Sequence, residues 1–236
     1  MRSCICLFYI CSFVAPARGQ VADALYADRA NLASARRAAG MWSAELARDA
    51  MQFDAAWKLA RVDYWLGGHV PEGERRAAYE EGIAAGQKAI RSKPDRPEGH
   101  FWAAANMGAL AESFGLRQGL KYRKTIKDEL ETVLRIDPSY EQGSADRALG
   151  RWYYKVPRLF GGNRSLAEQH LRASLQYNDK SIITHFFLAE LFADSGRTAD
   201  ARAAVQKVLD LPIDPQWAPE DEEFKARART MLAAMK

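Results

Sequence analysis

The sequence predicts an all-α fold in which antiparallel helix pairs stack into a solenoid that ends in a C-terminal capping helix. Apolar residues recur at steps of three and four almost throughout residues 21–235, and no sustained alternation of period two occurs. Turn signals, most of them prolines or glycines, divide these segments into pairs. The chain has 236 residues, of which 48% are hydrophobic and 27% charged, enough for one soluble unit with an apolar core.

The first 19 residues differ from the rest and predict a secretory signal peptide. Arg2 gives a positive start, residues 4–14 form an uncharged apolar run, and small residues at 15–19 indicate cleavage before Gln20. The run is too short for a permanent membrane span, although an uncleaved anchor is the alternative. We therefore expect export to the periplasm, a mature chain of residues 20–236 forming one domain, and no stable membrane span in it.

Charge and cysteine usage exclude several functional classes. The net charge is +4, and two of these charges lie in the leader, so the balance is too mild to indicate nucleic acid or a membrane surface. The three cysteines Cys4, Cys6 and Cys11 also lie in the leader. The mature chain is therefore expected to have no disulfide, no thiolate catalysis and no cysteine metal site.

Two helix pairs are expected in the N-terminal half, over residues 22–50 and 54–93. The first segment is one long helix or two, with Gly40 as the expected break. In the second, Asp54 is the expected N-cap and Gly67-Gly68 the expected end of the first helix.

Pro71 then opens the second helix of that pair, which contains Gly82 and Gly86. Each glycine inside a helix costs about 1 kcal/mol relative to alanine. We expect the close approach of a neighbouring helix to compensate for this cost.

Three more pairs are expected over residues 97–137, 140–178 and 181–211, followed by a cap at 217–235. The pairs end at prolines or at an Asn-Asp turn, and the last interval is about 34 residues, the length of a tetratricopeptide repeat. Each pair buries its apolar face only by stacking on its neighbours. The cap carries apolar residues on one face and charges on the other: the apolar ones are Phe224, Ala228, Met231, Leu232 and Met235.

Several motifs in the second half of the chain occur together: Ile136-Asp137-Pro138-Ser139-Tyr140, Gly143, Leu149-Gly150-Arg151-Trp152-Tyr153-Tyr154, Pro157, Phe160-Gly161-Gly162, Ala167 and His170. Across roughly residues 95–210 they resemble the TatT family, the tetratricopeptide-like T components associated with TRAP-type transporters. The resemblance implies a periplasmic α-solenoid, association with a solute-binding protein, and a groove for a small apolar ligand. Members are often lipoproteins, whereas Ile10 before Cys11 departs from the lipid-acceptor pattern.

Catalytic motifs are missing from the sequence. The four histidines include no pair at the i, i+4 spacing of a helical metal site, and neither a Gly-x-Ser-x-Gly elbow nor a phosphate-binding glycine-rich loop occurs. Gly161-Gly162 suits either an anion-binding backbone concavity or a simple turn, and the turn is favoured.

Two groups of residues are candidates for contacts with a ligand or partner. Lys121, Arg123 and Lys124 crowd the first turns of a helix, where cations oppose the helix dipole, so they form either a solvated turn or a patch for an acidic partner. Aromatic residues on the first helices of pairs form either the core or a ligand-contacting wall. The candidates for that wall are Tyr64, Trp102, Tyr153 and Tyr154.

These features predict a non-catalytic, exported binding or scaffold protein without cofactor or metal. In the first reading it is the partner of a TRAP-type solute-binding protein, or a carrier of a small apolar or anionic ligand. In the second it is a general tetratricopeptide scaffold of the cell envelope with no transporter role. An enzyme with an unrecognised site is the third reading.

Overall fold

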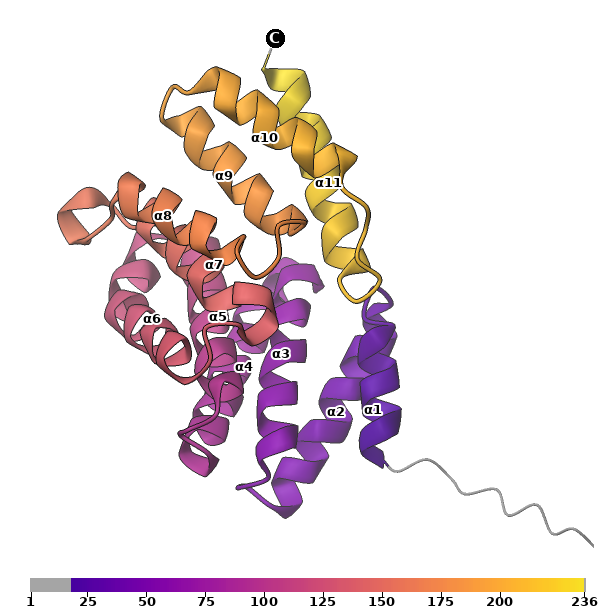
Figure 1. Ribbon diagram of the computed structural model, residues 1–236. Coiled ribbons are helices and arrows are strands. Elements are labelled where there is room, and N and C mark those ends of the chain that lie inside the picture. Colours follow the sequence, from indigo (N-terminus) through magenta and orange to yellow (C-terminus); the bar gives the residue numbers. More distant parts are fainter. Residues whose placement is uncertain (1–17, 236) are drawn as a thin grey trace, which may run out of the picture.

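Figure 1 shows the computed structural model, which describes residues 18–235 as stacked helices, with no β-strand among them. Five helix pairs follow one another, and a last helix, α11 (Ala218–Ala234), covers the end of the stack. The predicted all-helical class is confirmed. The pairs are α1 (Arg18–Ala27) with α2 (Leu32–Arg48), α3 (Phe53–His69) with α4 (Glu72–Ser92), α5 (Pro97–Phe114) with α6 (Leu116–Ile136), α7 (Tyr140–Lys155) with α8 (Arg164–Ser174), and α9 (Ile182–Asp194) with α10 (Thr198–Asp210).

Most of the predicted signal peptide lies outside the described residues. Positions 1–17, which contain all three cysteines, belong to that part, whereas Arg18 and Gly19 open α1. None of the helices within residues 18–235 combines the length and the apolar character that a bilayer span requires.

Short polar side chains start several helices. The Asn163 side chain accepts a hydrogen bond from the Ser165 N–H at 2.9 Å at the start of α8, and Ser181 accepts one from the Thr184 N–H at 3.3 Å at the start of α9. These caps satisfy backbone N–H groups that have no partner inside the helix. Pro97 stands in the first turn of α5, where the missing N–H costs nothing.

The N-terminal pair breaks at residues 28–31 rather than at Gly40. Asn31 caps α2 by accepting from the Ala33 N–H at 3.0 Å, whereas Gly40 lies exposed inside α2. The prediction was wrong because one glycine costs only about 1 kcal/mol inside a helix, which a well-capped helix tolerates.

The ends of α3 also differ from the expected positions. Gln52, not Asp54, is the N-cap, and its side chain accepts from the Ala55 N–H at 2.6 Å. The helix continues through Gly67-Gly68 to His69. A Cβ atom at Gly67 would lie 2.3 Å from the Tyr79 ring, so this glycine allows α4 to approach α3 and does not end the helix.

The two glycines inside α4 lie where a neighbouring helix comes close, as expected from the sequence. A Cβ atom at Gly86 would lie 2.8 Å from the backbone nitrogen of Ala103 in α5, and one at Gly82 would lie 2.4 Å from the Asn106 side chain. Asn106 is buried and donates to the Ala60 carbonyl at 2.8 Å. The three successive helices α3, α4 and α5 are therefore packed against one another at this point.

The apolar core is divided along the stack. One large cluster of buried residues extends through α1 to α7, and two smaller clusters unite α8 to α11. The predicted apolar face of the cap is confirmed, since Ala228 is fully buried and the Phe224 ring centroid lies 5.3 Å from that of Phe186.

Polar side chains at the start of α11 also reach the opposite end of the chain. Arg29, 3% exposed in the turn after α1, donates to Glu220 Oε1 at 2.8 Å and to the Gln216 carbonyl at 3.0 Å. His69 Nε2 lies 2.5 Å from Glu223 Oε1. Figure 1 accordingly shows the lower end of α11 beside the upper end of α1. The cap thus encloses a space against the first helices.

Candidate functional site

The enclosed space is a groove of about 770 Å³. Its walls come from the first helices α3, α5, α7 and α9, with further residues from α6 and α11. This volume lies within the range of about 300–1,000 Å³ that is typical of ligand sites. The groove is therefore the candidate site.

Aromatic side chains form much of the groove wall. The ring centroids of Tyr64 and Trp102 lie 5.8 Å apart, and Phe101 meets Trp102 edge to face at 5.0 Å. Trp102 Nε1 donates to the Tyr140 hydroxyl at 3.1 Å, which fixes the indole. Tyr64 is 38% exposed, yet burial raises its pKa to about 12. Both facts fit a side chain that faces an enclosed groove and not the outer surface.

Ion pairs connect several helices at one end of the groove. Arg151 donates to Glu112 at 3.0 and 2.8 Å and also pairs with Glu190, so α5, α7 and α9 are connected. Arg227 of α11 contacts the same Glu190 at 3.4 Å. A guanidinium that binds two carboxylates fixes both in orientation as well as in distance.

The side chains of Arg147 and Glu141 differ from these lining residues, since neither makes a hydrogen bond or ion pair with any residue in 18–235. Burial lowers the pKa of Arg147, although Tyr64 and Glu141 favour its charged form. Burial raises the pKa of Glu141, against the influence of Arg61 and Arg147. The sequence analysis missed both residues, because no periodicity distinguishes a charge that faces a groove from one that faces solvent.

Three of the predicted contact residues line the groove: Tyr64, Trp102 and Arg123. The Arg123 guanidinium lies 5.6 Å from the Phe160 ring centroid, and its carbonyl accepts from Trp152 Nε1 at 2.9 Å. These residues come from α3, α5 and α6, so three helices bring them to one surface.

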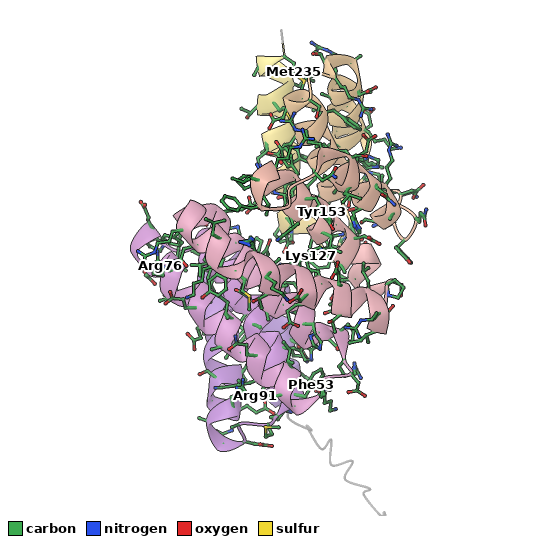
Figure 2. The ribbon with its side chains drawn as sticks, turned by 90° about the vertical axis from the view of Figure 1, so that its left-hand side faces the viewer. Phe53, Arg76, Arg91, Lys127, Tyr153 and Met235 are labelled. Carbon is green, nitrogen blue, oxygen red and sulfur yellow. The ribbon has the colours of Figure 1, made fainter. Side chains whose placement is uncertain are left out.

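Tyr153 and Tyr154, although on a first helix, do not line the groove. The Tyr153 ring stacks on His170 of α8 with centroids 5.4 Å apart, and Figure 2 shows it near Lys127. The Tyr154 hydroxyl donates to Asp194 at the end of α9. The Tyr153 ring thus packs within its own helix pair, whereas the Tyr154 hydroxyl contacts the next pair.

Lys121 and Lys124 are exposed on α6 and do not line the groove either. Lys124 pairs with Asp128 one turn further on. Exposed pairs at this spacing contribute only about 0.2–0.5 kcal/mol. Of the two alternatives predicted from the sequence, the solvated turn fits these two lysines better than a patch shared with Arg123.

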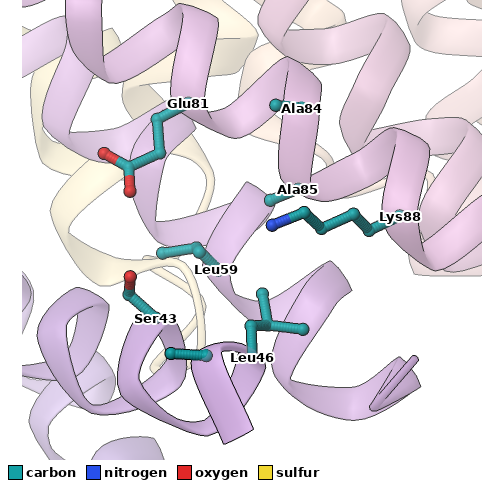
Figure 3. Close-up of a pocket in the computed structure, with 8 residues that line it drawn as sticks. Ser43, Leu46, Leu59, Glu81, Ala84, Ala85 and Lys88 are labelled. Atoms are coloured by element: carbon teal, nitrogen blue, oxygen red, sulfur yellow. The ribbon is translucent and has the colours of Figure 1, made fainter. Parts of the chain in front are cut away.

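A second, smaller pocket of about 190 Å³ lies between α2, α3 and α4. Figure 3 shows Glu81 and Lys88 at this pocket above Leu46 and Leu59. Burial, together with Glu81, raises the pKa of the neighbouring Asp63 well above its usual value, which suits a neutral buried carboxyl. The pocket is smaller than typical ligand sites, so the groove is the better candidate.

Each of the four histidines contacts at most one acidic side chain of residues 18–235. His170 Nδ1 lies 2.7 Å from Asp146 Oδ1, His100 contacts Glu129, and His185 Nε2 lies 2.8 Å from a backbone carbonyl. Within residues 18–235 no three histidine, aspartate, glutamate or cysteine side chains converge as metal ligands do.

The Gly161-Gly162 loop follows the short 3₁₀ helix η1 (Arg158–Phe160). Both glycine N–H groups donate within the loop, to the carbonyls of Arg158 and Pro157 at 3.2 Å each. A Cβ atom at Gly162 would lie 1.7 Å from a backbone oxygen. Of the two alternatives predicted for this loop, the simple turn fits these contacts, because the N–H groups of an anion-binding concavity would point outward.

Comparison with solved structures establishes the repeat type. The crystal structure of TTC0263, a thermophilic TPR protein of Thermus thermophilus, is similar with a TM-score of 0.67 at 23% identity, over 92% of this chain and 97% of that chain. At this identity the likeness shows the fold alone, a tetratricopeptide-type helical repeat. No curated protein sequence matches the chain significantly. The TatT family in particular finds no support in these comparisons.

A family model also matches a large part of the chain, residues 20–173, and is described as regulator of microtubule dynamics protein 1-3. The matched residues run from α1 to α8 and include the aromatic wall and both unpaired charges of the groove. The chain therefore belongs to the regulator of microtubule dynamics protein 1-3 family.

Proposed function

We propose that the chain is a non-catalytic interaction protein whose groove holds a segment of a partner protein. The groove supports this most directly, because successive helix pairs contribute to one concave surface, the surface that helical repeat proteins use for binding. Its wall is aromatic, and the charges at one end are engaged in ion pairs, which suits recognition better than acid–base chemistry. The family description names regulators of microtubule dynamics, and a protein partner is common to that description and to the repeat fold.

The dimensions of the groove favour an extended segment over a folded domain. Its lining extends from Tyr26 near the N-terminus to Arg227 in the cap, so an occupant would cross several helix pairs. The cap also narrows access from one side, since Glu220 and Glu223 hold it against the N-terminal half.

A photo-crosslinking experiment tests this proposal. Benzoylphenylalanine is introduced in place of Tyr64, in the groove, or of Met51, which is 55% exposed and does not line it. We expect irradiation of native cells to join one protein segment to position 64 and not to position 51. The synthetic segment should then bind the purified protein, and Tyr64→Ala should weaken binding by about tenfold, whereas Tyr153→Ala outside the groove should not. Equal crosslinking at both positions would contradict the proposal.

The finer proposal is a periplasmic protein that serves a solute-binding protein of a TRAP-type transporter. The leader and the motif resemblance support it. Mass spectrometry of the N-terminus of protein isolated from its native cells tests the leader: a mature chain that begins at Gln20 is expected, and an intact Met1 in folded protein would argue against export.

A further inference from the structure

The centre of the groove holds an arginine whose side-chain donors are unused. The Arg147 side chain projects from α7 without a hydrogen bond or ion pair in the described chain. Glu141, which favours the charged form of Arg147 together with Asp221, is also influenced by Arg61 of α3. The other acids that line the groove near the cap are engaged elsewhere: Glu220 pairs with Arg29, and Asp221 accepts from a backbone N–H at 2.9 Å. Arg147 thus has unused side-chain donors and lies within the influence of two carboxylates, Glu141 and Asp221.

Arg61 is held by aromatic rings. Its guanidinium lies 3.9 Å from the Tyr26 centroid and 4.8 Å from the Trp57 centroid, and its buried Nε has no hydrogen-bond partner. Stacking of this kind orients a guanidinium without using its N–H donors. Arg61 does not line the groove, so it influences the groove only through its charge on Glu141.

An unusual backbone turn places Glu141 in the groove. Glu141, Gln142 and Gly143 have φ values of 46°, 59° and 74°, a left-handed turn that non-glycine residues rarely adopt. A Cβ atom at Gly143 would lie 2.7 Å from the Tyr177 ring, and Gln142 accepts a hydrogen bond from the side-chain amide of Asn178. The packing of the α8 end therefore holds a strained turn at the groove, and strain of this kind is concentrated at functional sites.

The surroundings restrict which anion fits. A guanidinium matches a carboxylate in two parallel hydrogen bonds. A phosphate carries about −1.5 to −2 charges and would be repelled by Glu141 and Asp221 more strongly than a carboxylate. Tyr64 and Trp102 stand on the adjoining helices, so an aromatic or aliphatic group beside the carboxylate would contact their rings.

We propose that Arg147, with Tyr64, forms a subsite for a carboxylate of the partner segment, either an acidic side chain or a C-terminus, beside an apolar residue. This inference rests on the proposed function and specifies the chemistry of the occupant. Arg147 supplies the donors, and Tyr64 supplies the apolar contact.

Matched probes test the subsite. N-acetyl-tryptophan and its uncharged amide differ only in the carboxylate, N-acetyl-Trp-Asp-amide moves the charge to a side chain, and phenyl phosphate carries a larger charge. Binding is measured by NMR titration, which follows the arginine Nε–Hε signals. We expect at least one of the carboxylates to bind about tenfold or more tightly than the amide, and more tightly than phenyl phosphate. The tighter of the two carboxylates identifies the source, terminus or side chain.

Substitutions assign the preference to Arg147. Arg147→Gln should abolish the preference for the carboxylate, and Arg147→Lys should retain part of it, because the charge remains while the bidentate geometry is lost. Arg91→Gln, on the exposed surface of α4, should leave it unchanged. If Arg147→Gln does not fold, the lysine variant decides, since full retention of the wild-type preference in it would argue against two parallel hydrogen bonds.

The outcomes separate this inference from the proposed function. Equal affinity for acid and amide, or a preference that survives Arg147→Gln, would overturn the carboxylate subsite even if position 64 still crosslinks to a partner. Tighter binding of phenyl phosphate would overturn it in favour of a phosphorylated ligand. A clear carboxylate preference without any crosslinked protein would leave the subsite intact and refute the protein partner.

Discussion

Replacing Gly86 by alanine tests the close packing of α4 on α5. The added Cβ would lie 2.8 Å from the backbone nitrogen of Ala103 and 2.9 Å from its Cα and Cβ, so one helix backbone has to move. Overpacking of this kind costs about 1–3 kcal/mol, whereas the better helix propensity of alanine returns about 1 kcal/mol. We expect a net loss of up to about 2 kcal/mol in the free energy of unfolding.

Gly40→Ala is the matched control, because Gly40 is also inside a helix and a Cβ there meets nothing within 4 Å. It should gain up to about 1 kcal/mol from propensity alone. Both variants gain this propensity, so they should differ by the overpacking cost of about 1–3 kcal/mol, which for a chain of this size corresponds to roughly 2–12 °C in Tm. Urea unfolding followed by circular dichroism measures the difference. If Gly86→Ala were as stable as Gly40→Ala, the argument from close packing would be refuted.

Three further substitutions test the cap and the loop. Glu220→Ala leaves the buried Arg29 guanidinium without its acid, so a loss on the order of 3 kcal/mol and faster hydrogen exchange in α11 are expected, and unchanged exchange there would contradict the link. Burial lowers the pKa of His69, but hydrogen bonds with Glu223 and a backbone carbonyl raise it overall. The folded state therefore binds this proton more tightly than the unfolded state does. The resulting stabilisation is present below about pH 6.5 and is lost as the pH rises through the raised pKa. The Tm of the wild type should fall over this pH range, whereas the Tm of His69→Gln should not show this fall. Gly162→Ala would place a Cβ 1.7 Å from a backbone oxygen, and proteolysis should cut the displaced loop, whereas a resistant loop would count against the geometry.

Local signals in the sequence predict the helix pairs well, because prolines, caps and apolar periodicity act over a few residues. The pair expected over residues 97–137 is formed by α5 and α6, which together run from Pro97 to Ile136. The break expected at Gly40 does not occur, because a glycine only weakens a helix, whereas the Asn31 cap starts one.

The groove could be predicted only in part. Tyr64 and Trp102 line it, whereas Tyr153 lies on a first helix too but turns toward His170 of the next helix. The direction in which a tyrosine side chain points depends on packing between helices. The sequence patterns around Tyr64 and Tyr153 are similar and do not distinguish the two cases. The left-handed turn at Glu141 has no local signature either, because it is held by contacts with residues that follow more than 30 positions later.

The pairing of Arg29 with Glu220 has a consequence for how the chain assembles as it is made. A polypeptide emerges from the ribosome N-terminus first, and its early parts begin to fold before the later parts exist. The turn after α1 would then carry a charge destined for burial, while Gln216 and Glu220, its partners, are still untranslated. The N-terminal pair therefore reaches its final packing only after nearly the whole chain has been synthesised, and a truncated product lacking α11 would keep that turn open to water and to chaperones.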